Sequence, residues 1–332
     1  MSLDIAATKP HERLAAHLSA DLAAVNALIR DRMASEHAPR IPQVTAHLIE
    51  AGGKRLRPML CLAAARACGY AGPYHIHLAA TVEFIHTATL LHDDVVDEST
   101  QRRGRPTANL LWDNQSSVLV GDYLFARAFQ LMVEPGSLRV LDILANASAT
   151  IAEGEVLQLT AARDLATGEE TYLKVVRGKT AALFSAATQA GAVIAGADPA
   201  VEQALFDYGD ALGIAFQMVD DLLDYGGTSA IGKNTGDDLR EGKLTLPVIR
   251  ALAAADEEER AFWQRTIVRR QVEEADLERA RAIMARHGAL ESTRATALDW
   301  AGRAKAALAA VPTGAIRDML ADLSDYVVAR IA

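Results

Sequence analysis

The stretch from Tyr74 to Glu98 reads YHIHLAATVEFIHTATLLHDDVVDE and decides the fold class. Apolar side chains recur in it at positions i, i+3, i+4 and i+7, which predicts one long helix. The same spacing recurs through most of the chain, whereas alternating β-branched runs bounded by turn residues are almost absent. The sequence therefore predicts an all-α fold.

Working outward from this stretch, the periodicity predicts further helices. They are expected over residues 10–35, 41–52, 58–69, 74–98, 115–133, 137–164, 169–196 and 198–225, with several shorter helices after Leu244. No segment rich in Pro, Ser and Gly divides the chain. We therefore expect a single domain over residues 1–332, with a catalytic core at about 41–250 and peripheral helices at about 251–332.

Composition and charge exclude several classes of protein. The 332 residues are 50% hydrophobic, enough for a large core, and the formal net charge of −9 provides no global field for nucleic acid or an anionic membrane. No stretch has the roughly 18 apolar residues of a membrane span, and the N-terminus does not resemble a secretory signal. Cys61 and Cys68 are expected to be reduced core residues, which favours a cytoplasmic location.

Two identical DDxxD motifs end long apolar helices. They are Asp93, Asp94 and Asp97, and Asp220, Asp221 and Asp224. At about 100° per residue the three carboxylates of each motif share one helix face, and they lie near a helix C-terminus, where negative charge is unfavourable. Compensation by a cation is therefore expected. Carboxylate oxygens are the ligands that Mg²⁺ and Mn²⁺ prefer, so the sequence predicts metal binding.

Short basic clusters beside glycines could bind phosphate. They contain Lys54, Arg55 and Arg57, then Arg102, Arg103 and Arg105, and finally Lys179, Lys233 and Lys243. Guanidinium groups bind phosphate in a bidentate manner, and adjacent glycines allow close approach. We expect Arg102 and Arg103, about 100° apart on a helix-like turn, to reach different diphosphates. No P-loop or dinucleotide-binding motif is present.

These motifs together resemble the trans-prenyl diphosphate synthases, also called polyprenyl synthetases, and most of all the long-chain bacterial enzymes. The resemblance runs from about Lys54 to Pro247. It rests on GGKRLRP, EFIHTATLLHDDVVDESTQRRGRPTAN, VGDYLFARAF, GKTAALF, FQMVDDLLDY and GKNTGDDLREGKLTLP. It implies an isoprenoid synthase-type helical bundle, a homodimer, and a deep central cavity with the two aspartate motifs facing each other across its mouth.

The resemblance also implies roles for individual residues. The six aspartates would hold three Mg²⁺ ions on an allylic diphosphate, which Arg102, Lys179, Lys233 and Lys243 would also bind. Isopentenyl diphosphate would be bound by Lys54, Arg57, His86 and Arg103. Thr180 and Gln217 would lie near the reacting allylic carbon. The reaction would be head-to-tail condensation to a long all-trans polyprenyl diphosphate for a quinone side chain.

Product length is expected to depend on Ala88 and Thr89. They precede Asp93 by roughly 7.5 and 6 Å along the helix axis. Short-chain members of the resembled family carry a bulky aromatic residue near here, and Ala88 leaves the path open. This favours octaprenyl to decaprenyl products.

Several alternatives remain at this point. They are a farnesyl or geranylgeranyl diphosphate synthase, a non-catalytic partner subunit, a class I terpene cyclase, a di-iron protein using Glu83 and His86, and a phosphohydrolase using His92 and Asp93. The second motif is again DDxxD, unlike that of a cyclase, and the basic clusters favour condensation. Whether Arg330 closes over the site is left open by the sequence.

Overall fold

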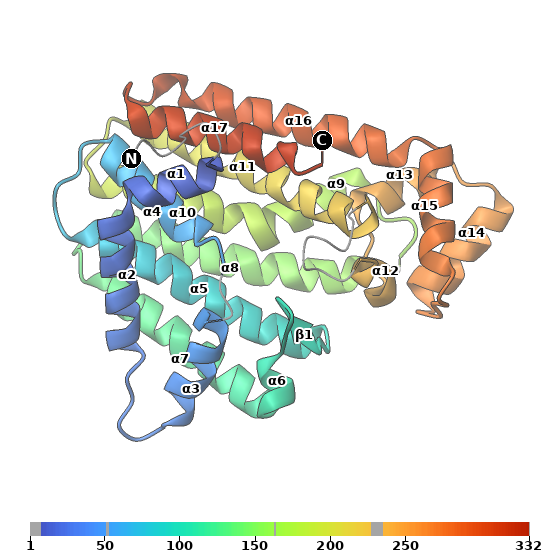
Figure 1. Ribbon diagram of the computed structural model, residues 1–332, viewed down its shortest axis with the longest axis horizontal. Helices are drawn as coiled ribbons and strands as arrows, with labels where there is room; N and C mark the ends of the chain where they lie inside the picture. The colour runs from blue at the N-terminus through green and yellow to red at the C-terminus, as the bar shows by residue number, and fades with distance from the viewer. Residues whose placement is uncertain (1–7, 51–52, 163, 227–234, 332) are drawn as a thin grey trace. The chain divides into compact units, whose positions relative to one another are not determined.

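The computed structural model describes residues 8–50, 53–162, 164–226 and 235–331. In these ranges almost all regular structure is helical, and strands β1 (Gln101–Arg102) and β2 (Arg105–Pro106) form a short antiparallel hairpin (Figure 1). The prediction of an all-α fold is therefore confirmed. No helix in this described part of the chain is both long and apolar enough to cross a lipid bilayer.

The chain folds into two compact units, each assembled from segments that are distant in the sequence. Unit 1 contains Met1–Ser148, Leu183–Gly209 and Lys305–Tyr326. Unit 2 contains Ala149–Ala182, Asp210–Ala304 and Val327–Ala332. The expected single domain, with its core at about 41–250, stays a prediction.

Unit 1 is built around the long helix α5 (Tyr74–Val96). Three helices of the same unit pack against it: α2 (Ser19–Arg32), α4 (Leu56–Ala67) and α7 (Asn114–Val133). Because α5 has several neighbours, Leu78, Phe84, Ile85 and Leu91 are all buried rather than only one face of the helix. Truncating Ile85 to alanine is expected to cost about 2–5 kcal/mol. This packing fixes the C-terminal end of α5, where the first aspartate motif lies.

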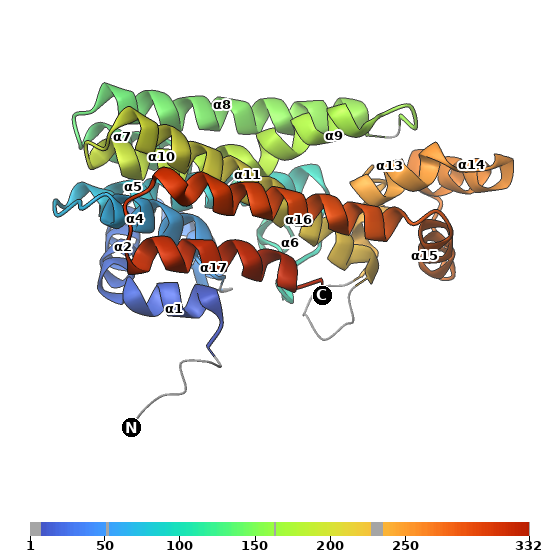
Figure 2. The same ribbon diagram turned by 90° about the horizontal axis from the view of Figure 1, so that it is seen from above.

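Shorter helices complete unit 1. They are α1 (Pro10–His17), α3 (Arg40–Glu50), α6 (Ala108–Leu111) and most of α10 (Ala182–Ile194). Figure 2 shows α17 (Ala315–Ala329) alongside α1, and an ion pair between Arg13 and Asp322 joins the two helices. The C-terminal helix is thereby attached to the N-terminal one.

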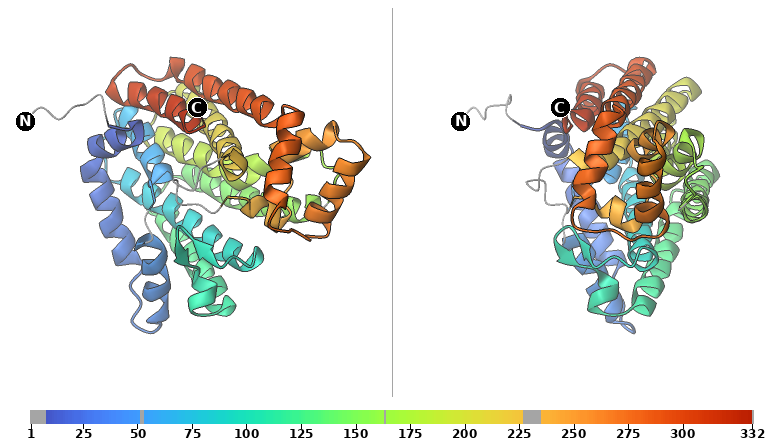
Figure 3. Two further views of the ribbon diagram at one scale, coloured as in Figure 1. Left: turned by 45° about the vertical axis from the view of Figure 1, so that its right-hand side comes forward. Right: turned by 90° about the vertical axis from the view of Figure 1, so that its right-hand side faces the viewer.

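Unit 2 contains α9 (Glu169–Val176), which continues directly into the π-helix η2 (Arg177–Ala181). It also contains a group of short helices, seen together in Figure 3: α12 (Asp237–Glu241), α13 (Leu246–Ala253), α14 (Glu257–Trp263), η4 (Gln264–Val268) and α15 (Asp276–Arg286). Their shared core includes the buried residues Tyr225, Trp263, Ile267 and Met284. Burying apolar surface stabilises this arrangement by a free energy of about 25 cal/mol per Å². This gain holds together helices that are too short to be stable alone.

Besides α10, whose first residue belongs to unit 2, four helices contribute residues to both units. They are α8 (Leu138–Ala161), α11 (Pro199–Gly226), α16 (Ala289–Ala307) and α17, and a short 3₁₀ turn η5 (Leu308–Ala310) follows α16. Helix α11 ends in the second aspartate motif. The C-terminal ends of α5 and α11 therefore each carry one aspartate motif, the first in unit 1 and the second in unit 2.

Three local predictions are wrong. The expected helix over 10–35 is broken at Leu18, whose ψ of 17° departs from helical geometry. The expected helix over 169–196 contains the π-helical turn η2 instead of continuing as an α-helix. The expected helix-like turn at Arg102 and Arg103 is the β1–β2 hairpin, because Arg103 and Gly104 have φ values of 54° and 73°. Two consecutive positive φ values are typical of a tight type I′ hairpin turn.

Candidate active site

The first aspartate motif ends α5. Asp94 is fully buried, and its Oδ1 accepts hydrogen bonds from Arg102, at 2.9 Å from Nε and 2.7 Å from Nη2. Its Oδ2 is also buried and has no hydrogen-bond partner among the described residues. Burial raises the pKa of Asp94, and the Arg102 guanidinium opposes that shift. Asp93 and Asp97 flank Asp94 in half-buried positions.

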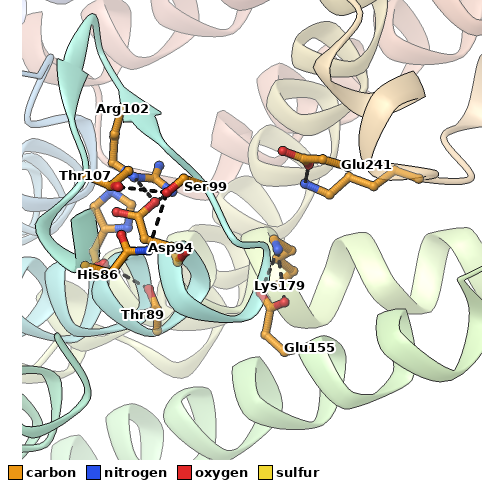
Figure 4. A network of polar contacts seen from close by, with 11 residues as sticks. His86, Thr89, Asp94, Ser99, Arg102, Thr107, Glu155, Lys179 and Glu241 are labelled. Carbon is orange, nitrogen blue, oxygen red and sulfur yellow. Dashed lines mark hydrogen bonds and ion pairs between the residues drawn. The ribbon is translucent and has the colours of Figure 1, made fainter. Parts of the chain in front are cut away.

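The β1–β2 hairpin directs two neighbouring arginines differently. Arg102 points at Asp94, as Figure 4 shows. The Arg103 guanidinium lies against Gly53, where an added Cβ would be 2.6 Å from Nη1. Thr107 braces the base of the hairpin, since its hydroxyl donates to the Ser99 carbonyl at 2.7 Å. The two arginines point in different directions from a turn that is not helical, and their binding of different diphosphates stays a prediction.

His86 lies within a cluster of arginines in unit 1. Burial lowers its pKa well below the usual value, and the charges of Arg57, Arg103, Arg102 and Arg55 lower it further. Arg57 donates from Nη1 toward His86 Nε2 at 3.2 Å. His86 is therefore a neutral imidazole near pH 7, with its Nε2 as an acceptor and its Nδ1 left to carry the proton.

Two more basic side chains of the predicted set are oriented by aromatic rings. The Arg57 guanidinium stacks 4.8 Å from the centre of the Phe184 ring, and Lys54 Nζ lies 5.3 Å from the centre of the Tyr326 ring. Such cation–π contacts are worth about 0.5–2 kcal/mol and restrict long side chains to one direction. Both contacts lie within unit 1.

The second aspartate motif, in unit 2, has a different protein partner for each carboxylate. Asp220 accepts a hydrogen bond from Arg330 at 3.2 Å. Asp221 accepts from Tyr172 at 2.6 Å and from Gln217 at 2.9 Å. Burial raises the pKa of Asp221 to about 6, and the hydrogen bonds from Tyr172 and Gln217 oppose that shift.

The third carboxylate of this motif, Asp224, accepts hydrogen bonds from backbone amides. The amides of Asp237 and Asp238 donate to it at 3.2 and 3.1 Å, at the start of α12. These bonds counter the unfavourable position of a carboxylate at the C-terminal end of α11. Arg330, for which the sequence left the role open, bonds to the first aspartate of this motif, and closure over a site stays untested.

The π-helix η2 presents Lys179 and Thr180. Lys179 Nζ donates to Glu155 on α8 at 3.0 Å, and Thr180 Oγ1 donates to Gln217 Oε1 at 2.8 Å. Close backbone packing makes this possible, since a Cβ on Gly178 would lie 2.7 Å from the Gly154 Cα. A π-helical turn inside a helix is rare and frequently marks a functional site.

The remaining predicted residues are placed as follows. Lys243 forms an ion pair with Glu241, and Lys233 lies outside the described residues. Ala88 is fully buried on α5, whereas Thr89 is half-buried and donates to the His86 carbonyl at 2.9 Å. No metal-binding group of three or more His, Cys, Asp or Glu side chains occurs in the part of the chain that the structure describes. Four of the motif carboxylates, those of Asp94, Asp220, Asp221 and Asp224, accept hydrogen bonds from protein donors.

The donor chemistry nevertheless fits a hard divalent cation. All candidate ligands are carboxylate oxygens, and the buried Asp94 Oδ2 lacks a hydrogen bond. Two supporting residues, Glu155 and Tyr172, were not predicted from the sequence. Each lies far along the chain from its partner, so no local motif signals it. A buried charge or hydroxyl opposite a motif residue is recognised only once the helices are packed.

Comparison with known proteins identifies the family of this chain. The sequence profile described as "Polyprenyl synthetase" matches residues 38–284. The chain is 46% identical over 315 residues to octaprenyl diphosphate synthase from Escherichia coli, covering 93% of this chain and 96% of that protein. Among solved structures, a decaprenyl diphosphate synthase from Rhodobacter capsulatus has 72% identity and a TM-score of 0.94, with coverage of 97% and 99%.

A second solved structure is a polyprenyl synthase from Caulobacter crescentus complexed with calcium and isoprenyl diphosphate. It has 54% identity and a TM-score of 0.93, and the alignment covers 97% of this chain and 98% of that one. The family resemblance and the fold inferred from the motifs are thereby confirmed. The chain belongs to the polyprenyl synthetase family and is a prenyltransferase enzyme.

Proposed function

We propose that the protein is a Mg²⁺-dependent synthase that adds isopentenyl diphosphate head-to-tail to an allylic diphosphate and yields a long all-trans polyprenyl diphosphate. The octaprenyl and decaprenyl relatives support the long product, and a quinone side chain is its proposed destination. One observation carries most weight: a buried aspartate, Asp94, has one oxygen on Arg102 and the other unpaired. A shorter-chain synthase is the alternative.

In unit 1, the proposed binding residues for isopentenyl diphosphate are Lys54, Arg57, His86 and Arg103. The stacking of Arg57 on Phe184 supports this role, because it orders a guanidinium before the diphosphate arrives. The neutral His86 adds no charge of its own and has a hydrogen bond from Arg57. Arg102 is proposed to bind the allylic diphosphate, since it is already directed at Asp94.

In unit 2, Lys179, Lys233 and Lys243 are proposed to neutralise the same allylic diphosphate. Lys179 is the best defined of them because Glu155 fixes its ammonium group. Thr180 and Gln217 form a hydrogen-bonded pair, which supports their placement near the reacting carbon. Positive groups directed at a leaving diphosphate lower the barrier to breaking its C–O bond.

We further propose that Asp93, Asp94, Asp97, Asp220, Asp221 and Asp224 hold three Mg²⁺ ions, with Mn²⁺ as a possible substitute. Bound metal would supply charge neutralisation for the departing diphosphate. Arg102, Arg330 and Tyr172 orient individual carboxylates of this set. The calcium in the Caulobacter crescentus structure supports a divalent-cation site in this family.

The condensation requires an apolar surrounding for the allylic carbon. When the C–O bond breaks, the double bond of isopentenyl diphosphate forms the new C–C bond, and one proton is lost to the released diphosphate. Buried apolar residues on α5, including Phe84, Ile85, Ala88 and Leu91, support the exclusion of water along that helix. Ala88 and Thr89 are the proposed determinants of product length.

A homodimer is the proposed assembly. Exposed apolar side chains gather on α6 and the following helix α7, including Leu110, Leu111, Leu119, Phe129 and Val133. Monomeric proteins rarely leave such a patch uncovered, and a second copy is the proposed partner. The free cysteines support the proposed cytoplasmic location. Sedimentation of wild type and Leu119→Asp would test the assembly, with dissociation expected for the variant.

The central experiment combines purified protein, Mg²⁺, labelled isopentenyl diphosphate and an allylic starter, with mass analysis of the products. Octaprenyl to decaprenyl diphosphate is expected, and excess chelator should stop turnover. Arg103→Gln should chiefly raise the KM for isopentenyl diphosphate, and Arg102→Gln should chiefly impair the allylic substrate. Full activity in chelator, or a product no longer than geranylgeranyl diphosphate, would contradict the proposal.

A further inference from the structure

Glu83 is a buried carboxylate in unit 1 to which neither the motifs nor the proposed reaction assigns a role. It is 7% exposed on α5 and forms an ion pair with Arg55, which is itself outside the proposed substrate-binding set. Burying a charge is costly unless it is paired. A glutamate at this position therefore requires an explanation beyond filling space.

The partner of Glu83 lies in the segment that carries two proposed substrate-binding residues. Arg55 directly follows Lys54, precedes Arg57 by two residues, and adopts a left-handed φ of 49° at the start of α4. Its other guanidinium nitrogen donates to the Ile49 carbonyl at 3.2 Å. This conformation is unfavourable for a residue other than glycine, and the two side-chain contacts help to offset its cost. The ion pair therefore fixes the backbone from which Lys54 and Arg57 project.

The charge of Glu83 also affects Arg103, the arginine of the β1–β2 hairpin. Burial lowers the pKa of Arg103, and the charges of Arg102 and Arg55 lower it as well, whereas the Glu83 carboxylate raises it. His86 lies one helical turn after Glu83, on the same face of α5. The carboxylate thus pairs with Arg55 before α4 and its charge acts on Arg103 of the hairpin, while His86 lies on the same face of α5.

We propose that Glu83 is a positioning residue that holds the arginine cluster in the arrangement needed to bind the diphosphate of isopentenyl diphosphate. The inference rests on the proposed function, because that function assigns Lys54, Arg57, His86 and Arg103 to this substrate. Glu83 does not touch the substrate in this scheme. It acts through Arg55 and Arg103, as a counter-charge that keeps repelling guanidinium groups together.

The sign of the expected effect separates this role from simple electrostatics. Removing a negative charge beside a diphosphate site should tighten diphosphate binding if position does not matter. If Glu83 positions the arginines, Glu83→Gln should instead weaken it. We expect the KM for isopentenyl diphosphate to rise by about tenfold or more, with the KM for the allylic diphosphate changed by less than about twofold.

A matched control lies in the same unit. Asp21 on α2 forms a comparable part-buried ion pair with Arg66 on α4, with contacts of 2.7 and 2.8 Å. Asp21→Asn should lower the melting temperature without changing either KM. If both variants changed the two KM values in the same way, the effect of Glu83→Gln would reflect general loosening of the fold, and the positioning role would be refuted.

A second variant covers the case in which Glu83→Gln fails to fold. The pair Glu83→Gln with Arg55→Gln replaces both charges by amides that can bond to each other, so the fold is expected to persist. A positioning role predicts that weak binding of isopentenyl diphosphate remains, because Arg103 still lacks its counter-charge. A merely structural role predicts recovery to the wild-type KM, and that recovery would overturn the proposal.

Calorimetry with inorganic diphosphate separates the two proposals. If wild type does not turn over isopentenyl diphosphate, the proposed function fails. The cluster can still be examined then, since Glu83→Gln should bind inorganic diphosphate more weakly than wild type. If wild type is active and Glu83→Gln binds both diphosphates as tightly as wild type or more tightly, the role of Glu83 alone is refuted.

Discussion

Substituting Gly178 by alanine should separate α8 from η2 and disturb Lys179. The added methyl would lie 2.7 Å from the Gly154 Cα and 3.0 Å from the Thr150 carbonyl oxygen. Both are backbone atoms, so neither can rotate away. Since carbon atoms prefer separations of about 3.5–4.0 Å, the two helices would have to move apart by close to 1 Å.

The change in the free energy of unfolding is the difference between the cost of overpacking and the gain from replacing glycine in a helix. Overpacking of this kind typically costs about 1–3 kcal/mol, and exchanging glycine for alanine in a helix returns up to about 1 kcal/mol. A net loss of about 1–2 kcal/mol is expected, which lowers Tm by a few degrees. The displacement also moves Lys179 relative to Glu155, and misplacement by about 1 Å can reduce the rate by about 100-fold.

The assay pairs urea unfolding with the condensation rate, using Gly302→Ala as the control. Gly302 lies in α16, with nothing within 4 Å of an added Cβ. That change should stabilise the protein by about 0.5–1 kcal/mol and leave the rate unchanged. Gly154→Ala should resemble Gly178→Ala, because it meets the same contact from the other side. If Gly178→Ala were as stable and as active as Gly302→Ala, the reasoning about close packing would be wrong.

Three further outcomes are expected. Ala88→Phe should shorten the product without preventing the first condensations, as mass analysis of the products would reveal, and an unchanged length would show that the chain grows elsewhere. Asp93→Ala and Asp220→Ala should each reduce the rate by several orders of magnitude with little change in Tm; a large fall in Tm would indicate structural roles. The hydrogen bond from Arg66 lowers the pKa of Asp21, so stability should be lost as the pH falls below about 4, and Asp21→Asn should lose less in acid unfolding.

The long helices could be predicted because their apolar spacing is a local property of the sequence. The helix expected over 74–98 is observed as Tyr74–Val96, and the one expected over 198–225 as Pro199–Gly226. The π-helical turn was not predicted, and it lies where Gly178 meets Gly154 of another helix, a contact that local spacing does not reveal. The hairpin at Arg103 was missed for a different reason: arginine rarely adopts a positive φ, and only the neighbouring Gly104 signalled a turn.

The residues of the candidate site also fall into two groups, those that the sequence indicates and those that only the structure reveals. The proposed aspartates stand out in the sequence because their motif occurs twice, and the proposed lysines and arginines because they cluster beside glycines. Their partners do not stand out. Nothing near Tyr172 in the sequence indicates that its hydroxyl bonds to Asp221, and nothing near Glu155 indicates that it pairs with Lys179. Such contacts depend on the packing of helices, which periodicity alone does not determine.

The aspartate motifs also qualify the argument that like charges at a helix end require a metal ion. Arg102 bonds to Asp94, Arg330 to Asp220, and the amides at the start of α12 to Asp224. Protein donors therefore already offset part of the repulsion among these carboxylates. The proposed metal binding would have to exchange or share these hydrogen bonds, so its affinity would be the difference between two sets of contacts. Arg330→Gln should accordingly tighten Mn²⁺ binding, measured by equilibrium dialysis, whereas weaker binding would show that Arg330 orients Asp220 for the metal.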